Sequence, residues 1–202
     1  MVRSLSVAVI AGLLVGTGVA LASPKPLPLR DRLIKQGEFA GYRPESKKQS
    51  FSTAKAWVVG GPHPSAAQTS AEIARLHREG FVAVLSEFLD RGSERGNGLS
   101  WVMQLGSAAS ARAELKADVR ENKAASGGSS SAFPVPAIPG AQGFRVSGGG
   151  SVGENIFFAD GPFLYLVGQG FSSADKTPPT RAGLIAAVKK LYTRVHSHPA
   201  GF

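Results

Sequence analysis

The stretch ENIFFADGPFLYLVGQGF, residues 154–171, decides the fold. It holds two runs rich in aromatic and β-branched residues, a composition that favours β-strands. Asp160-Gly161 lies between them, and an Asp-Gly pair between two such runs indicates a tight hairpin. Residues 154–159 and 163–171 are therefore predicted to form two antiparallel strands.

The neighbouring segments extend this pattern. Further strands are predicted by their apolar and β-branched content at 81–90, 99–105 and 143–147. Helices are predicted by capping residues and apolar spacings of three and four at 52–59, 65–79, 107–125 and 179–195. From residue 65 the order is α-β-β-α-β-β-β-α. We therefore expect an α+β fold, with a mostly antiparallel sheet of about five strands flanked by helices.

The first 22 residues have the form of a signal peptide. Arg3 precedes an uncharged apolar run, and Ala20-Leu21-Ala22 fits the small-x-small cleavage pattern. About 20 apolar residues can span a bilayer, so the alternative is an uncleaved N-terminal membrane anchor. We expect a signal peptide at 1–22, a basic Pro-containing arm at 23–55 and a single α+β domain at 56–202. The protein should be secreted or extracytoplasmic.

Composition excludes several chemistries. The chain has no cysteine, which excludes disulfide frameworks, thiolate nucleophiles, thiolate zinc sites and lipid attachment to a cysteine. Lys+Arg is 23 and Asp+Glu is 14, a formal charge of +9. The basic residues are not interleaved with aromatic side chains that could stack bases, so nucleic acid is not the expected partner. Possible partners are an anionic envelope polymer, lipid headgroups or an acidic protein. Alternatively, the charge serves solubility alone.

The glycine-rich run at 148–153 matches two functional patterns. It fits G-x-G-x-x-G, which binds phosphates, and G-x-S-x-G, which would make Ser151 a nucleophile. Both patterns function only between a strand and a following helix. Here a strand follows, so we interpret the run as a hairpin loop. No cofactor and no metal site are expected, since His196 and His198 lack a third ligand.

Two groups of residues are candidates for binding. Phe157 and Phe158 are adjacent, so they face opposite sides of one strand and both sides should be covered. The last predicted helix carries basic residues, including Lys189, Lys190 and Arg194. On the helix at 107–125 we expect the charged residues to face water; these are Arg112, Glu114, Lys116, Asp118 and Arg120.

Several patches resemble small secreted or membrane-tethered proteins of actinobacteria. The patches are GFVAV at 80–84, GLS at 98–100, SAASARAEL at 107–115, FPVPAIPGA at 133–141, GF at 143–144, ADG at 159–161 and YLVG at 165–168. The layout is also similar to the Mog1/PsbP-like class, whose curved antiparallel sheet is flanked by helices. That resemblance implies a binding module, and it assigns no functional residue.

We therefore expect an exported cell-envelope binding or interaction module that is not an enzyme. One alternative is a small-molecule or lipid carrier with a cavity between the sheet and the helices. A third possibility is a serine hydrolase that uses Ser151.

Overall fold

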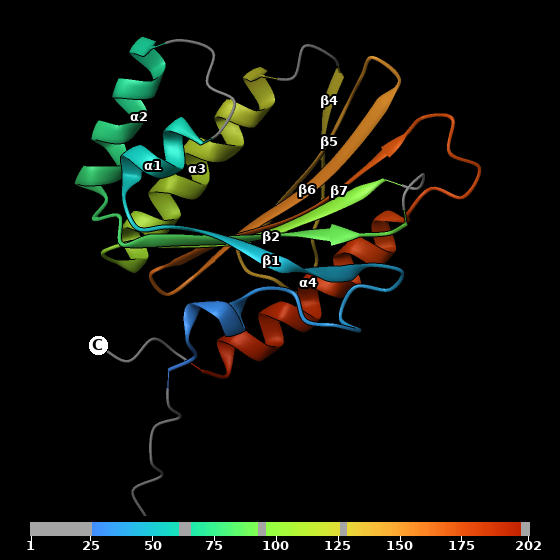
Figure 1. Cartoon of the computed structure of the whole chain (residues 1–202), viewed down its shortest axis with the longest axis horizontal. Coiled ribbons are helices and arrows are strands. Elements are labelled where there is room, and N and C mark those ends of the chain that lie inside the picture. Colours follow the sequence, from blue (N-terminus) through green and yellow to red (C-terminus); the bar gives the residue numbers. More distant parts are fainter. Residues whose placement is uncertain (1–25, 61–65, 93–95, 126–128, 199–202) are drawn as a thin grey trace, which may run out of the picture.

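The computed structural model describes residues 26–60, 66–92, 96–125 and 129–198 (Figure 1). A seven-stranded antiparallel sheet runs in the order β1-β2-β3-β7-β6-β5-β4. The strands are β1 (Arg43–Phe51), β2 (Ala83–Asp90), β3 (Asn97–Gln104), β4 (Ser129–Phe133), β5 (Gln142–Gly148), β6 (Ser151–Asp160) and β7 (Phe163–Ser172). The helices are η1 (Leu29–Arg32), α1 (Ala54–Val59), α2 (Ala66–Arg78), α3 (Ala108–Ala125) and α4 (Arg181–His196).

The hairpin predicted from residues 154–171 is confirmed as β6 and β7. Phe158 pairs with Tyr165 and Asp160 pairs with Phe163, so the turn lies at Gly161-Pro162. Gly161 has a φ of 57°, a left-handed conformation that glycine adopts without steric cost. β6 and β7 occupy the middle of the sheet, and β3 pairs along its whole length with β7.

The predicted strand count was wrong. The sheet has seven strands and not about five, so the predicted order of elements also fails, although the class is α+β. The two strands that the sequence did not reveal are β1 and β4, and they form the two edges of the sheet.

Edge position explains why these strands were missed. β1 (RPESKKQSF) and β4 (SSSAF) leave most of their side chains exposed. An edge strand pairs on one side only, and charged residues or proline there discourage pairing with other chains. Neither strand therefore shows the alternation of apolar and polar residues by which a half-buried strand is recognised.

Helices cover both faces of the sheet (Figure 1). Phe157 belongs to a core under α3 with Trp101 and Leu164, and Phe158 belongs to a second core under α4 with Tyr165 and Leu191. The expectation that both sides of this strand are covered is thus met by helices.

The segment before β1 packs against α4. Leu33, Ile34 and Phe39 are almost fully buried in the core that contains α4. Arg194 of α4 donates hydrogen bonds to both carboxylate oxygens of Glu38, at 2.7 and 2.8 Å. Residues within 23–55, where an arm was expected, thus contact the rest of the fold. The predicted signal peptide lies outside the described residues.

None of the helices in the described part of the chain is long and apolar enough to cross a membrane.

Candidate functional site

A cavity of about 640 Å³ opens between α3 and the sheet, where β5 begins and β6 ends. Leu115 and Val119, both largely buried, form its helical wall, and Ala159 of β6 lies in the wall formed by the sheet. Pro139 and Gly140 close another side. Gly140 has a φ of 71°, so the turn before β5 uses a conformation that favours glycine.

The rim of this cavity is basic. Arg112, Lys116 and Arg120 line it from α3, and all three side chains are exposed. They are four residues apart, so they follow one another along a single side of the helix over about 12 Å. The remaining polar residue of the described lining is Gln142, and none of the described lining residues is a carboxylate. We call Arg112, Lys116 and Arg120 the basic stripe.

Most of the charge of the basic stripe is not neutralised by neighbours. Arg120 lies 3.9 Å from Glu121, and both of these side chains are partly exposed. Within the described residues, Arg112 and Lys116 make no ion pair. The stripe therefore presents at least two free cations beside an apolar cavity, an arrangement that favours a ligand with an apolar part and an anionic group.

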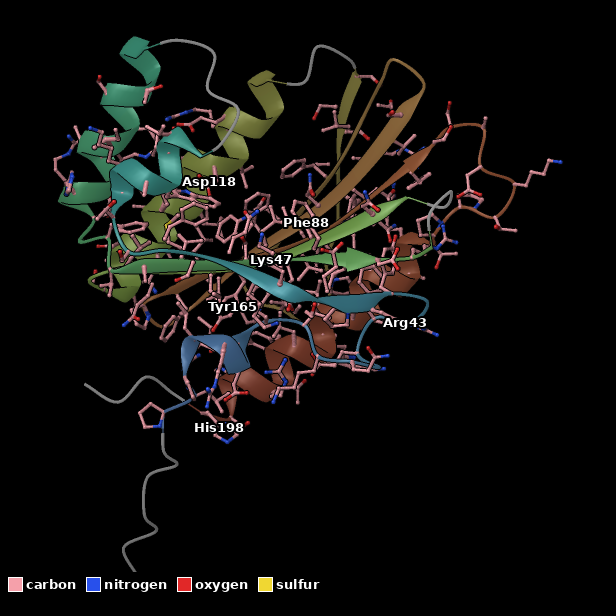
Figure 2. The ribbon with its side chains drawn as sticks, viewed as in Figure 1. Arg43, Lys47, Phe88, Asp118, Tyr165 and His198 are labelled. Carbon is pink, nitrogen blue, oxygen red and sulfur yellow. The ribbon has the colours of Figure 1, made fainter. Side chains whose placement is uncertain are left out.

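The opposite side of α3 carries the helix's acidic residues. Glu114 is only 1% exposed, which corrects the expectation that all the charged residues of this helix face water. Arg75 of α2 donates hydrogen bonds to both oxygens of Glu114, at 2.9 and 3.0 Å, and it also pairs with Glu121. Asp118 lies among the helices on this side of the sheet, whereas Tyr165 and His198 lie on the other (Figure 2).

Burial dominates the ionisation of these acids. It raises the pKa of Glu114, although the Arg75 guanidinium acts in the opposite direction. It also raises the pKa of Asp118 well above its usual range, and the nearby Glu114 carboxylate adds to that effect. Arg75 therefore provides the cation that lets α2 and α3 pack with acids between them.

The glycine-rich run 148–153 forms a hairpin turn, as predicted. Gly148 pairs with Ser151, and Gly149 and Gly150 both have positive φ values in the two-residue loop. Ser151 is exposed at the start of β6. Within the described residues, its side chain makes no hydrogen bond to a histidine or a carboxylate.

The residues predicted to bind lie apart from the cavity. Phe157 and Phe158 are 1% and 0% exposed within the two cores. Lys189 and Lys190 are exposed on α4, and Lys190 Nζ lies 3.4 Å from the Gly37 carbonyl. Arg194 is engaged with Glu38 and with the Leu33 carbonyl. A binding role for these five residues stays a prediction.

No group of three or more His, Asp or Glu side chains in the described part of the chain is placed to hold a metal ion. His196 Nδ1 lies 3.0 Å from Asp160 Oδ1, and its ring stacks on that of Tyr192. These contacts tie the end of α4 to the β6–β7 hairpin.

Sequence reasoning offered a cavity between the sheet and the helices as one alternative, but it did not identify the lining residues, because they come from segments far apart in the chain. The turn at 139–142 lies beside α3 only through the tertiary fold. One local indication was available, since cations at positions i, i+4 and i+8 of a helix must lie on one side of it.

No family model matches the chain, and no curated protein matches it. Among solved structures, the fold is similar to the crystal structure of the extracellular domain of PknH from Mycobacterium tuberculosis. The TM-score is 0.50 at 12% sequence identity, and the match covers 85% of this chain and 100% of that domain. The likeness shows a shared fold with an actinobacterial extracellular domain. The Mog1/PsbP-like layout stays a prediction.

Proposed function

We propose that this protein is an extracytoplasmic, non-catalytic binding domain that holds an amphiphilic small molecule in the cavity beside α3. The observation that carries the proposal is the cavity itself. Its volume of about 640 Å³ falls within the range of about 300–1,000 Å³ that is typical of sites for small ligands.

The character of the walls supports binding rather than catalysis. The lining formed by the described residues consists of apolar side chains, the basic stripe and the Gln142 amide, and it includes no carboxylate or histidine that could act as a general base. A hydrolase that uses Ser151 is less well supported, because this serine lies in an exposed hairpin and not in the cavity.

Location outside the cytoplasmic membrane is supported by the sequence of residues 1–22 and by the fold shared with an extracellular domain. N-terminal sequencing of the protein recovered from its host tests this part. Cleavage after Ala22 would leave Ser23 as the first residue, whereas recovery of the intact chain in the cytosol would contradict export.

The binding site can be tested with N-phenylnaphthylamine, a neutral probe that fluoresces in apolar surroundings. We expect the full chain to bind it, and Ala159→Phe to weaken binding by about tenfold because the added ring occupies the cavity. Gln142→Trp narrows the same cavity from an exposed position and should act alike. Ala186→Phe, on the exposed side of α4, is the matched control and should bind as the wild type does.

Equal probe binding by the wild type, Ala159→Phe and Gln142→Trp would show that the cavity is not the site. Thermal unfolding of each variant separates a filled cavity from a damaged fold, since Gln142→Trp alters a residue that is not part of either core.

A further inference from the structure

The charge around the α3 cavity defines the chemical class of its ligand. Among the described residues that line the cavity, the ionisable ones are the three cations of the basic stripe, and they lie along one side of α3. The walls behind them are formed by Leu115, Val119 and Ala159. A ligand that matches both the apolar walls and the basic rim has an apolar body inside the cavity and an anionic group at the rim.

We propose that the cavity selects a single-chain amphiphile with a phosphate or carboxylate headgroup, which Arg112 and Lys116 recognise at the rim. This inference rests on the proposed function and adds the sign of the ligand's charge and its position at the rim.

Arg112 and Lys116 are the residues best placed to recognise the anion. Both are without an ion-pair partner in the described part of the chain, whereas Arg120 shares charge with Glu121. An anion at the rim would therefore gain two cations without breaking an existing pair. A zwitterionic headgroup would bring its own positive charge to the same place and would lose this advantage.

The acidic residues of α3 do not neutralise the charge of the basic stripe. Glu114 accepts two hydrogen bonds from Arg75, and Glu121 also pairs with that guanidinium. Glu114 and Glu121 are thus paired on the α2 side of the helix, and most of the charge of the basic stripe remains unneutralised at the cavity. This sorting of charge on one helix gives the cavity its selectivity for anions.

The experiment measures displacement of N-phenylnaphthylamine from the full chain by two lysophospholipids with the same oleoyl chain, both below their micellar concentrations. Lysophosphatidate is anionic and lysophosphatidylcholine is zwitterionic. We expect lysophosphatidate to displace the probe at a concentration about tenfold lower, because both lipids carry a charged phosphate but only lysophosphatidylcholine adds a choline cation that the basic stripe repels. This preference should shrink as salt is added, since the rim is exposed.

The double variant Arg112→Gln/Lys116→Gln should lose the preference and still bind the neutral probe. Lys189→Gln/Lys190→Gln removes the same amount of charge from α4 and should keep the preference for lysophosphatidate. Every variant carries residues 1–22, so any affinity of that segment for lipid is the same in all of them. Glycerol phosphate, the headgroup without the chain, should displace little probe. If it displaces as well as lysophosphatidate, the ligand is a free phosphate ester and the amphiphile proposal is wrong.

Equal displacement by the two lysophospholipids in the wild type would overturn the inference. A preference for lysophosphatidate that survives in Arg112→Gln/Lys116→Gln, or that disappears in Lys189→Gln/Lys190→Gln, would also overturn it. The function proposed above would stand in these cases, provided that the neutral probe binds in the cavity. Failure of the probe itself to bind would instead remove the proposed function.

Discussion

Arg32 Nη1 lies 2.9 Å from Tyr165 Oη and donates a hydrogen bond to it, across 133 residues of sequence. The guanidinium is 1% exposed and lies 3.8 Å above the centre of the Phe163 ring. It also donates to the Leu27 and His198 carbonyls. A buried cation thus joins the segment before β1 to β7 and to the end of α4, and carbonyl, phenol and ring groups surround it in place of water.

Removing the Tyr165 hydroxyl should leave a charged donor without its acceptor. We expect Tyr165→Phe to lower the free energy of unfolding by about 2 kcal/mol, measured by urea denaturation at constant m-value. In the Tyr165→Phe background, Arg32→Met should lower the free energy of unfolding by about 1 kcal/mol less than it does in the wild type. Tyr192→Phe, whose hydroxyl makes no hydrogen bond within the described residues, is the control. Additive effects of the two substitutions would show that the bond contributes nothing.

The tyrosines should titrate late. Burial raises the pKa values of Tyr42 and Tyr165 to about 12, from an ordinary value of 10.0, although nearby Arg91 and Arg32 respectively favour ionisation. Because the folded pKa values are the higher ones, the stabilisation is complete below pH 10 and is lost as the pH rises toward 12. Burial and the nearby Asp160 also raise the pKa of Tyr192. Ultraviolet titration should therefore show three phenols that ionise later in the folded chain than in concentrated urea. Ionisation of every tyrosine near pH 10 in folded protein would contradict the burial.

Arg75 should be the most sensitive residue at the interface of α2 and α3. Its side chain is 17% exposed and that of Glu114 is 1% exposed. Arg75→Met leaves Glu114 buried without its cation, so we expect a loss of about 3 kcal/mol at neutral pH. The loss should diminish as the pH falls and Glu114 becomes protonated. Arg120→Met, at a side chain that is 75% exposed, should change stability by less than about 0.5 kcal/mol. Similar losses in both variants would refute a special role for Arg75.

Gly143 should not tolerate a side chain. It pairs with Phe133 across β4 and β5, and a Cβ atom there would lie 2.4 Å from Phe133 Cε2. The Arg181 guanidinium also lies over that ring, 4.3 Å from its centre. We expect Gly143→Ala to cost about 1–3 kcal/mol through overpacking. Gly153→Ala, where a Cβ atom would meet nothing within 4 Å, is the matched control. Indistinguishable thermal unfolding of the two variants would show that the ring moves aside freely.

The central part of the fold was predictable from sequence, and its edges were not. The β6–β7 hairpin has aromatic residues on both faces and a turn at Gly161-Pro162, so its local pattern already specifies its structure. β1 and β4 bury few side chains, and only pairing with β2 and β5 makes them strands. Such pairing depends on residues distant in sequence, which local periodicity does not contain.

The residues that line the cavity were unpredictable for a related reason. The sequence shows that Arg112, Lys116 and Arg120 share one side of a helix, but it does not show that residues 139–142 will lie beside them. The same limit hid the pairing of Arg75 with Glu114, which made a buried acid look like one that faces solvent. Both errors concern contacts between elements and not the elements themselves.

Leu27 and Arg32 pack on the α4 side of the sheet, and this decides from which side the chain enters the fold. The described chain begins on the face of the sheet opposite α3 (Figure 1). An anchor retained at residues 1–22 would attach the domain through its α4 side, the side away from α3 and the cavity.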